Sequence, residues 1–115
     1  MTPPAIIYIP HADDLSLTFG VDVIKHLRAG RRVITVLYTD GQGSFVQDCL
    51  NGVSSSNYWG GTHNPEEEGY SLLSNIDFAN ARTKEYLSEG PQLGVNPDDV
   101  IVDFADTVDK EGVKT

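Results

Sequence analysis

Two continuous apolar runs, separated by one amphipathic segment, constrain the fold of this 115-residue chain more than any other feature. Residues 5–9 and 33–39 are rich in β-branched and aliphatic side chains without polar alternation, which is typical of strands buried on both faces. Between them, residues 15–29 place apolar side chains on one arc and polar ones opposite, which predicts an amphipathic helix capped by Gly30. A strand, a helix and a strand in this order predict a βαβ unit with parallel strands.

The rest of the chain is divided by a long polar segment. Residues 44–74 are rich in Gly, Ser and Asn and contain no Lys or Arg, which predicts a long irregular loop. A helix is expected over residues 77–89, ended by Gly90 and Pro91, and a third strand over residues 100–104. We therefore expect a single α/β domain over residues 1–115, with helices and a parallel sheet in a Rossmann-like, three-layer arrangement.

The charge of the chain is negative and unevenly distributed. Eight basic and 17 acidic residues give a formal net charge of −9, and residues 41–115 hold 13 of the acids but only four of the bases. Because phosphate groups bind clustered basic side chains, we expect neither nucleic acid nor an anionic membrane surface as a partner. A single cysteine, Cys49, excludes an intrachain disulfide, and no stretch has the length of a signal peptide or a membrane span. The cytoplasm is the expected compartment.

A cluster of polar side chains follows the first strand directly, in the sequence Pro10-His11-Ala12-Asp13-Asp14. The carboxyl end of a strand is where open α/β sheets place their ligands. His11 and Asp14 are candidate ligands of a divalent metal, and Asp13 is then free to act as a base on water that the metal activates. The alternative is that the two aspartates cap the following helix.

The same residues resemble a known family. The sequence AIIYIPHADD, with the helix, Gly30 and VITVLYTDG after it, resembles the amino-terminal half of the PIG-L/LmbE-like zinc-dependent N-deacetylases. A second block, Arg82-Thr83-Lys84-Glu85 with Leu93-Gly94-Val95, resembles this family in the same order, so the resemblance covers about residues 5–110. Members remove acetyl groups from N-acetylglucosamine-type sugars on diverse carriers. The resemblance implies a Rossmann-like fold, a Zn²⁺ cofactor and a small-molecule amino-sugar conjugate as substrate.

By position, the resemblance also implies a set of site residues: His11 and Asp14 as zinc ligands, Asp13 as general base, and Arg82 and Asp109 as substrate contacts. Asp106 is a rival for the last role. Two alternatives stay open, a surface ion pair of Arg82 with Glu85 on its own helix and a solvated tail position for Asp109.

The chain departs from the family pattern at three points, one of which is that the segment 44–74 is longer than the pattern leads us to expect. Leu15 stands where a Glu is usual, and the family's third zinc ligand, a histidine beyond the third strand, has no counterpart up to Thr115. His63 is a weak candidate for that third ligand. We therefore expect an incomplete domain whose site another chain or segment completes. The main hypothesis is a metal-dependent N-deacetylase. The alternative is a non-catalytic Rossmann-like module that binds a sugar or a partner through residues 44–74.

Overall fold

A computed structural model describes residues 2–42, 44–53 and 61–104 of the chain. Its elements in chain order are β1 (Ala5–Ile9), α1 (Asp14–Leu17), α2 (Gly20–Arg28), β2 (Val33–Leu37), α3 (Phe45–Leu50), α4 (Pro65–Glu68), α5 (Asn75–Leu93), the 3₁₀ turn η2 (Pro97–Asp99) and β3 (Val100–Val102). The three strands form one sheet in the order β1-β2-β3, and both pairs are parallel. The prediction of an α/β fold that begins with a parallel βαβ unit is confirmed.

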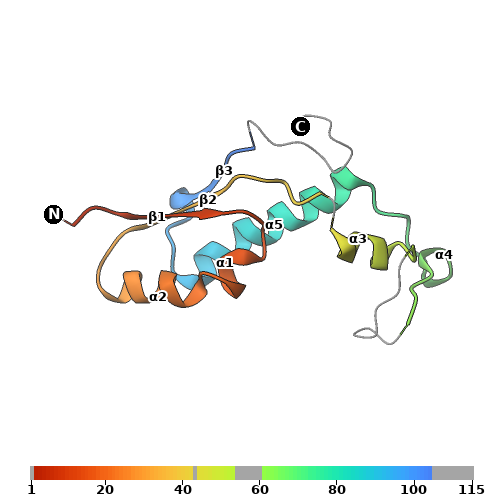
Figure 1. Cartoon of the computed structure of the whole chain (residues 1–115), viewed down its shortest axis with the longest axis horizontal. Helices are drawn as coiled ribbons and strands as arrows, with labels where there is room; N and C mark the ends of the chain where they lie inside the picture. Colours follow the sequence, from red (N-terminus) through yellow and green to blue (C-terminus); the bar gives the residue numbers. More distant parts are fainter. Residues whose placement is uncertain (1, 43, 54–60, 105–115) are drawn as a thin grey trace.

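The helices that pack on the sheet, α1, α2 and α5, lie on one side of it (Figure 1). Burial therefore alternates along β1: Ile9 is fully buried, whereas Ile6 and Tyr8 are 53% and 64% exposed. The prediction that this strand is buried on both faces is wrong for the described part of the chain, because no described helix covers the second face. Two layers, rather than the expected three, are seen among these residues.

Tyr86 fastens α5 to the sheet. It is the largest of the fully buried side chains, and its hydroxyl lies 2.8 Å from Thr35 Oγ1 on β2 and donates to the Ile101 carbonyl on β3 at 2.9 Å. Burial raises the pKa of the Tyr86 phenol, so the hydroxyl keeps the proton that it donates. One side chain thus joins the long helix to two strands, and the apolar core around it includes Ile9, Leu15 and other residues of β1, α1, α2 and β2.

Two helices differ from their predicted bounds. The single helix expected over residues 15–29 is interrupted after Leu17, where the Phe19 N–H bonds to the Asp14 carbonyl, five residues back, and Gly20, a poor helix former, begins α2. The later helix does not end at Gly90 and Pro91 but continues to Leu93 and ends at Gly94, whose φ of 101° gives a left-handed cap. Pro91 lies inside this helix and has no N–H to bond to the Leu87 carbonyl four residues back.

The segment 44–74 is less irregular than predicted. Its described residues contain α3 and α4, each begun by a polar N-cap: Ser44 Oγ accepts from the Val46 N–H, and Asn64 Oδ1 accepts from the Glu67 N–H. The third strand is also shorter than expected and ends at Val102. Within the described residues, no helix has both the length and the apolar character needed to cross a bilayer.

An ion pair joins the start of β2 to η2. Arg32 donates to Asp99 through Nε at 3.0 Å and through Nη2 at 2.7 Å. These hydrogen bonds hold the pKa of Asp99 below its ordinary value and raise the pKa of Arg32. A carboxyl whose pKa is lowered by folding contributes stability above its unfolded pKa of about 3.9 and loses it as the pH falls below that value.

We therefore expect Asp99→Asn to melt at a lower temperature than the wild type at pH 7 and to lose less stability from about pH 5 to about pH 2. Thermal unfolding over that pH series measures both effects. Asp98→Asn, an exposed neighbour on the same turn, is the matched control and should follow the wild type. Parallel curves for the wild type and Asp99→Asn would contradict the assignment.

Candidate functional site

The carboxyl ends of β1 and β2 open into a depression of about 300 Å³, which we call the strand-end depression. Three segments build it: the β1–α1 connection, the β2–α3 connection and α5. Its lining residues are His11, Asp13, Asp14, Gln42, Ser44 and Arg82. The Thr39 hydroxyl bonds to the Pro10 carbonyl and so holds the ends of the two strands together. Four of the five residues assigned from the sequence thus lie around one hollow.

His11 and Asp14 meet across a single turn. The Asp14 N–H donates to the His11 carbonyl at 3.0 Å, and the His11 N–H donates to Asp14 Oδ2 at 3.2 Å. This turn brings His11 Nδ1 to 3.4 Å from Asp14 Oδ2. Nitrogen and oxygen ligands of a tetrahedral zinc ion lie about 3.4 Å apart, given bonds of about 2.0–2.2 Å to the metal. The pair therefore fits two adjacent positions of a zinc coordination sphere.

The described residues do not supply a third ligand to this pair. Over residues 2–42, 44–53 and 61–104, no group of three or more His, Cys, Asp or Glu side chains could hold a metal ion. His63 lies elsewhere, in a separate pocket, where its Nδ1 is 3.1 Å from Glu68 Oε1. A catalytic zinc normally has three protein ligands, so His11 and Asp14 alone do not make up a complete zinc site.

Asp13 has a partner that sequence reasoning missed. It occupies the N-cap position of α1, but its side chain makes no cap hydrogen bond, so capping does not explain this carboxylate. Instead, Asp13 Oδ1 accepts from Arg82 Nη2 at 3.0 Å, across 69 positions of sequence. The side chain of Asp13 is 59% exposed and that of Arg82 only 16%, so a largely buried guanidinium holds an accessible carboxylate.

Arg82 is itself held on two further sides. Its Nη1 donates to the Gly41 carbonyl at 3.0 Å, and its guanidinium lies 5.6 Å from the centroid of the Phe78 ring, within cation–π range. Gly41 has a φ of 77°, and a Cβ built on it would lie 2.7 Å from Arg82 Nη1. The room that the arginine occupies therefore exists because residue 41 has no side chain.

Gln42 adds an unused acceptor to the same wall. Its backbone and side-chain N–H groups bond to Asp40, at 3.3 and 2.8 Å, whereas its Oε1 is buried without a hydrogen-bond partner among the described residues. No role was predicted for Gln42 from the sequence. Its place beside His11 follows from the fact that parallel strands end at the same edge, and this signal was present in the sequence.

The remaining predicted contacts, Asp109 and its rival Asp106, lie outside the described residues. Fold and depression together define an α/β protein with a polar hollow at the carboxyl edge of its parallel sheet. No protein-family model, curated protein sequence or solved structure matches this chain. The resemblance to the N-deacetylases therefore depends on the residues themselves.

Proposed function

We propose that this chain is the amino-terminal part of a zinc-dependent N-deacetylase of the PIG-L/LmbE-like kind, acting on an N-acetylglucosamine-type amino sugar on a larger carrier. The observation that supports this most is the convergence of Arg82, from the second block of resemblance, onto Asp13 of the first. The two blocks were identified separately along the sequence, and nothing in their spacing requires them to meet. Their meeting beside the His11–Asp14 pair is what a shared site needs.

Each residue then has a chemical task. His11 and Asp14 would hold the zinc ion, which when bound supplies Lewis-acid activation of water and of the acyl carbonyl. Asp13, an exposed carboxylate, accepts the proton of the attacking water. Arg82 fixes the orientation of that carboxylate through Oδ1. The unpartnered Oε1 of Gln42 suits an N–H donor, which an N-acyl group carries.

A further segment or a second chain completes this site in the proposal. It would bring the third zinc ligand, because the described residues hold only two. It would also cover the second face of the sheet, where Ile6, Tyr8 and Ile101 are exposed, because parallel sheets of Rossmann-like proteins are covered on both faces. Asp109 keeps its proposed role as a substrate contact.

Metal analysis and a deacetylation assay on the full chain test the proposal together. We expect near-stoichiometric zinc in the wild type and in Asp13→Asn, and little in His11→Ala, because Asp13 is not a ligand. Asp13→Asn should lower acetate release from N-acetylglucosaminides by about 10²-fold or more. Asp22→Asn, an exposed aspartate on α2, should leave both unchanged. Absence of zinc from the wild type, or full activity in Asp13→Asn, would exclude this function.

The second candidate function is a non-catalytic module that binds a sugar or a partner. Two observations favour it: the described residues hold no group of three candidate metal ligands, and Leu15 replaces a carboxylate and is fully buried in the core. Sugar binding that survives chelation of the metal, without any acetate release, would support this function over the first.

A further inference from the structure

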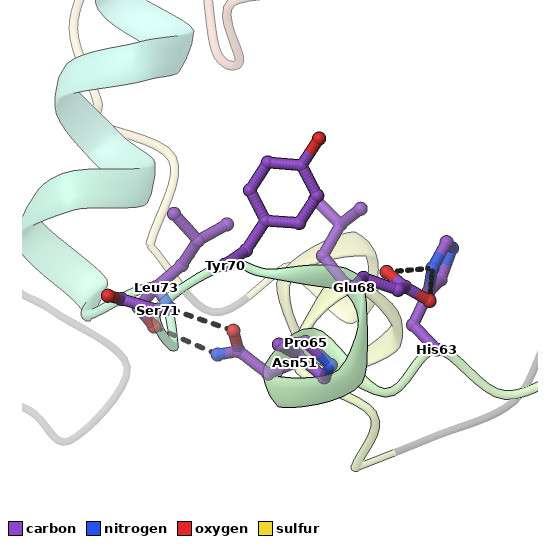
Figure 2. Close-up of a pocket in the computed structure, with 8 residues that line it drawn as sticks. Asn51, His63, Pro65, Glu68, Tyr70, Ser71 and Leu73 are labelled. Atoms are coloured by element: carbon purple, nitrogen blue, oxygen red, sulfur yellow. Dashed lines mark hydrogen bonds and ion pairs between the residues drawn. The ribbon is translucent and has the colours of Figure 1, made fainter.

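A second pocket, of about 280 Å³, lies between α3, α4 and the residues after α4 (Figure 2). We call it the α3–α4 pocket. Its walls are largely apolar and are formed by Leu50, Pro65, Tyr70 and Leu73. In Figure 2 the ring of Tyr70 and the side chain of Leu73 rise on the same side of the chain. The alternative hypothesis drawn from the sequence assigned binding to residues 44–74 as a whole and named no pocket or ligand chemistry within them.

The walls of the pocket are held in place without a ligand. Asn51 binds the backbone of Leu73 in both directions, with Nδ2 donating to the carbonyl and Oδ1 accepting from the N–H, each at 2.8 Å. Gly52, with a φ of 76°, lets the chain of His63 approach so closely that a Cβ would lie 2.4 Å from the His63 carbonyl oxygen. α3 is thereby fastened to both later segments, and the pocket is preformed, as small-molecule sites usually are.

Exposed apolar side chains are frequent in the segment that contains this pocket, and two of them, Leu50 and Tyr70, line it. Of the 14 large hydrophobic side chains that are exposed in the described residues, seven lie between positions 45 and 76. Contiguous patches of exposed apolar side chains often mark interaction or ligand-binding sites. The volume is at the lower limit of the usual range for ligand pockets, about 300–1,000 Å³, so a single ring or a short chain fits better than a long acyl chain.

The charge of the side chains around the pocket narrows the class of ligand further. Glu68 lies at the wall beside His63, with Glu66 and Glu67 preceding it on α4, and residues 44–74 contain no Lys or Arg. An anionic ligand would be repelled by this surface, whereas a neutral or cationic one would not. We propose that the α3–α4 pocket binds a small apolar group, of about one ring, that carries no negative charge.

The helix α3 runs from the strand-end depression to the α3–α4 pocket. Ser44, the N-cap of α3, lines the depression, and Leu50, the last residue of the same helix, lines the pocket. Six residues of helix separate them by about 9 Å along its axis. In a step that rests on the proposed function, the pocket is the subsite for the carrier of the amino sugar. The carrier is then apolar and uncharged or cationic at this point, not a phosphate ester.

Three monosubstituted benzenes of similar size and different charge test the pocket by itself: benzylamine, benzyl alcohol and benzoate. In NMR titrations of the full chain, the first two should shift the amide signals of Leu50, Tyr70 and Leu73 saturably, and benzoate should bind at least fivefold more weakly. Tyr70→Ala should weaken benzylamine at least fivefold. Tyr8→Ala, which removes a similarly exposed tyrosine on the sheet, should not. Shifts without saturation, equal binding of benzoate, or equal effects of the two variants would overturn the proposal.

Phenyl N-acetyl-β-glucosaminide tests the connection to the depression. It should bind more tightly than N-acetylglucosamine, shift signals of both Leu50 and Gln42, and lose its advantage in Tyr70→Ala. If the benzyl compounds bind but the phenyl group adds nothing, the carrier assignment is overturned and the pocket stands. If zinc and deacetylation are absent while the benzyl compounds still bind, the proposed function fails separately from the pocket.

Discussion

Replacing Tyr86 with alanine should bring this protein close to unfolding at room temperature. Truncation of a buried aromatic side chain costs about 3–5 kcal/mol, and single domains of this size are stable by about 5–15 kcal/mol. Tyr86 is fully buried, and its hydroxyl bonds to Thr35 on β2 and to Ile101 on β3. One side chain of α5 is thus bonded to both strands. Its loss also leaves the Thr35 hydroxyl and the Ile101 carbonyl without this partner. Urea denaturation measures the free energy of unfolding.

Two variants separate the ring from the hydroxyl and from tyrosine content in general. Tyr86→Phe keeps the packing and removes the hydrogen bonds, so we expect a loss of about 1–2 kcal/mol. Tyr70→Ala removes a tyrosine that is 73% exposed and should change stability by no more than about 0.5 kcal/mol. If Tyr86→Phe were as destabilising as Tyr86→Ala, packing of the ring would not be the main contribution.

The sequence was sufficient for the parts of the fold that depend on short-range pattern. The βαβ unit was predictable because the spacing of the apolar residues changes at residue 15 and again at residue 33. The break between α1 and α2 was not, because it lies in a change of backbone bonding that the apolar pattern does not report: the Phe19 N–H bonds to the Asp14 carbonyl, five residues back. The exposure of Ile6 and Tyr8 could not be predicted from the pattern either. A continuous apolar run indicates the environment that a strand favours, and it does not say which elements cover the strand.

The candidate site also has a part that was predictable from the sequence and a part that was not. His11, Asp13 and Asp14 are neighbours in sequence, so their proximity was predictable without any tertiary information. The role of Arg82 came from the resemblance alone, which implied a substrate contact and gave no indication that it bonds Asp13. No role was predicted for Gly41, because the reason for a glycine there is the guanidinium of a residue 41 positions further along the chain.

Gly41→Ala should disrupt the strand-end depression more than Gly30→Ala, although the two glycines have φ values of 77° and 78°. A left-handed backbone costs an alanine about 1–2 kcal/mol at either position. At Gly30 nothing lies within 4 Å of the added Cβ, so that strain is the whole cost. At Gly41 the Cβ would meet Arg82 Nη1 at 2.7 Å, so the end of the arginine side chain must shift, and its bonds to Gly41 and Asp13 are weakened. We expect Gly41→Ala to cost about 1 kcal/mol more than Gly30→Ala, because an exposed ion pair contributes about 0–1 kcal/mol and a hydrogen bond to a backbone carbonyl about 0.5–1.5 kcal/mol.

A double-mutant cycle decides whether the arginine is the cause. In an Arg82→Ala background the obstacle is gone, so Gly41→Ala should cost only the backbone strain, about 1–2 kcal/mol, as Gly30→Ala does in the wild type. The difference between the two backgrounds, measured by urea denaturation, is then the coupling of Gly41 to Arg82. A Gly41→Ala cost that is the same with and without Arg82 would mean that the glycine serves the turn alone. Because Asp13 is oriented through this same guanidinium, a positive coupling also implies that a residue with no functional group of its own determines where the proposed base stands.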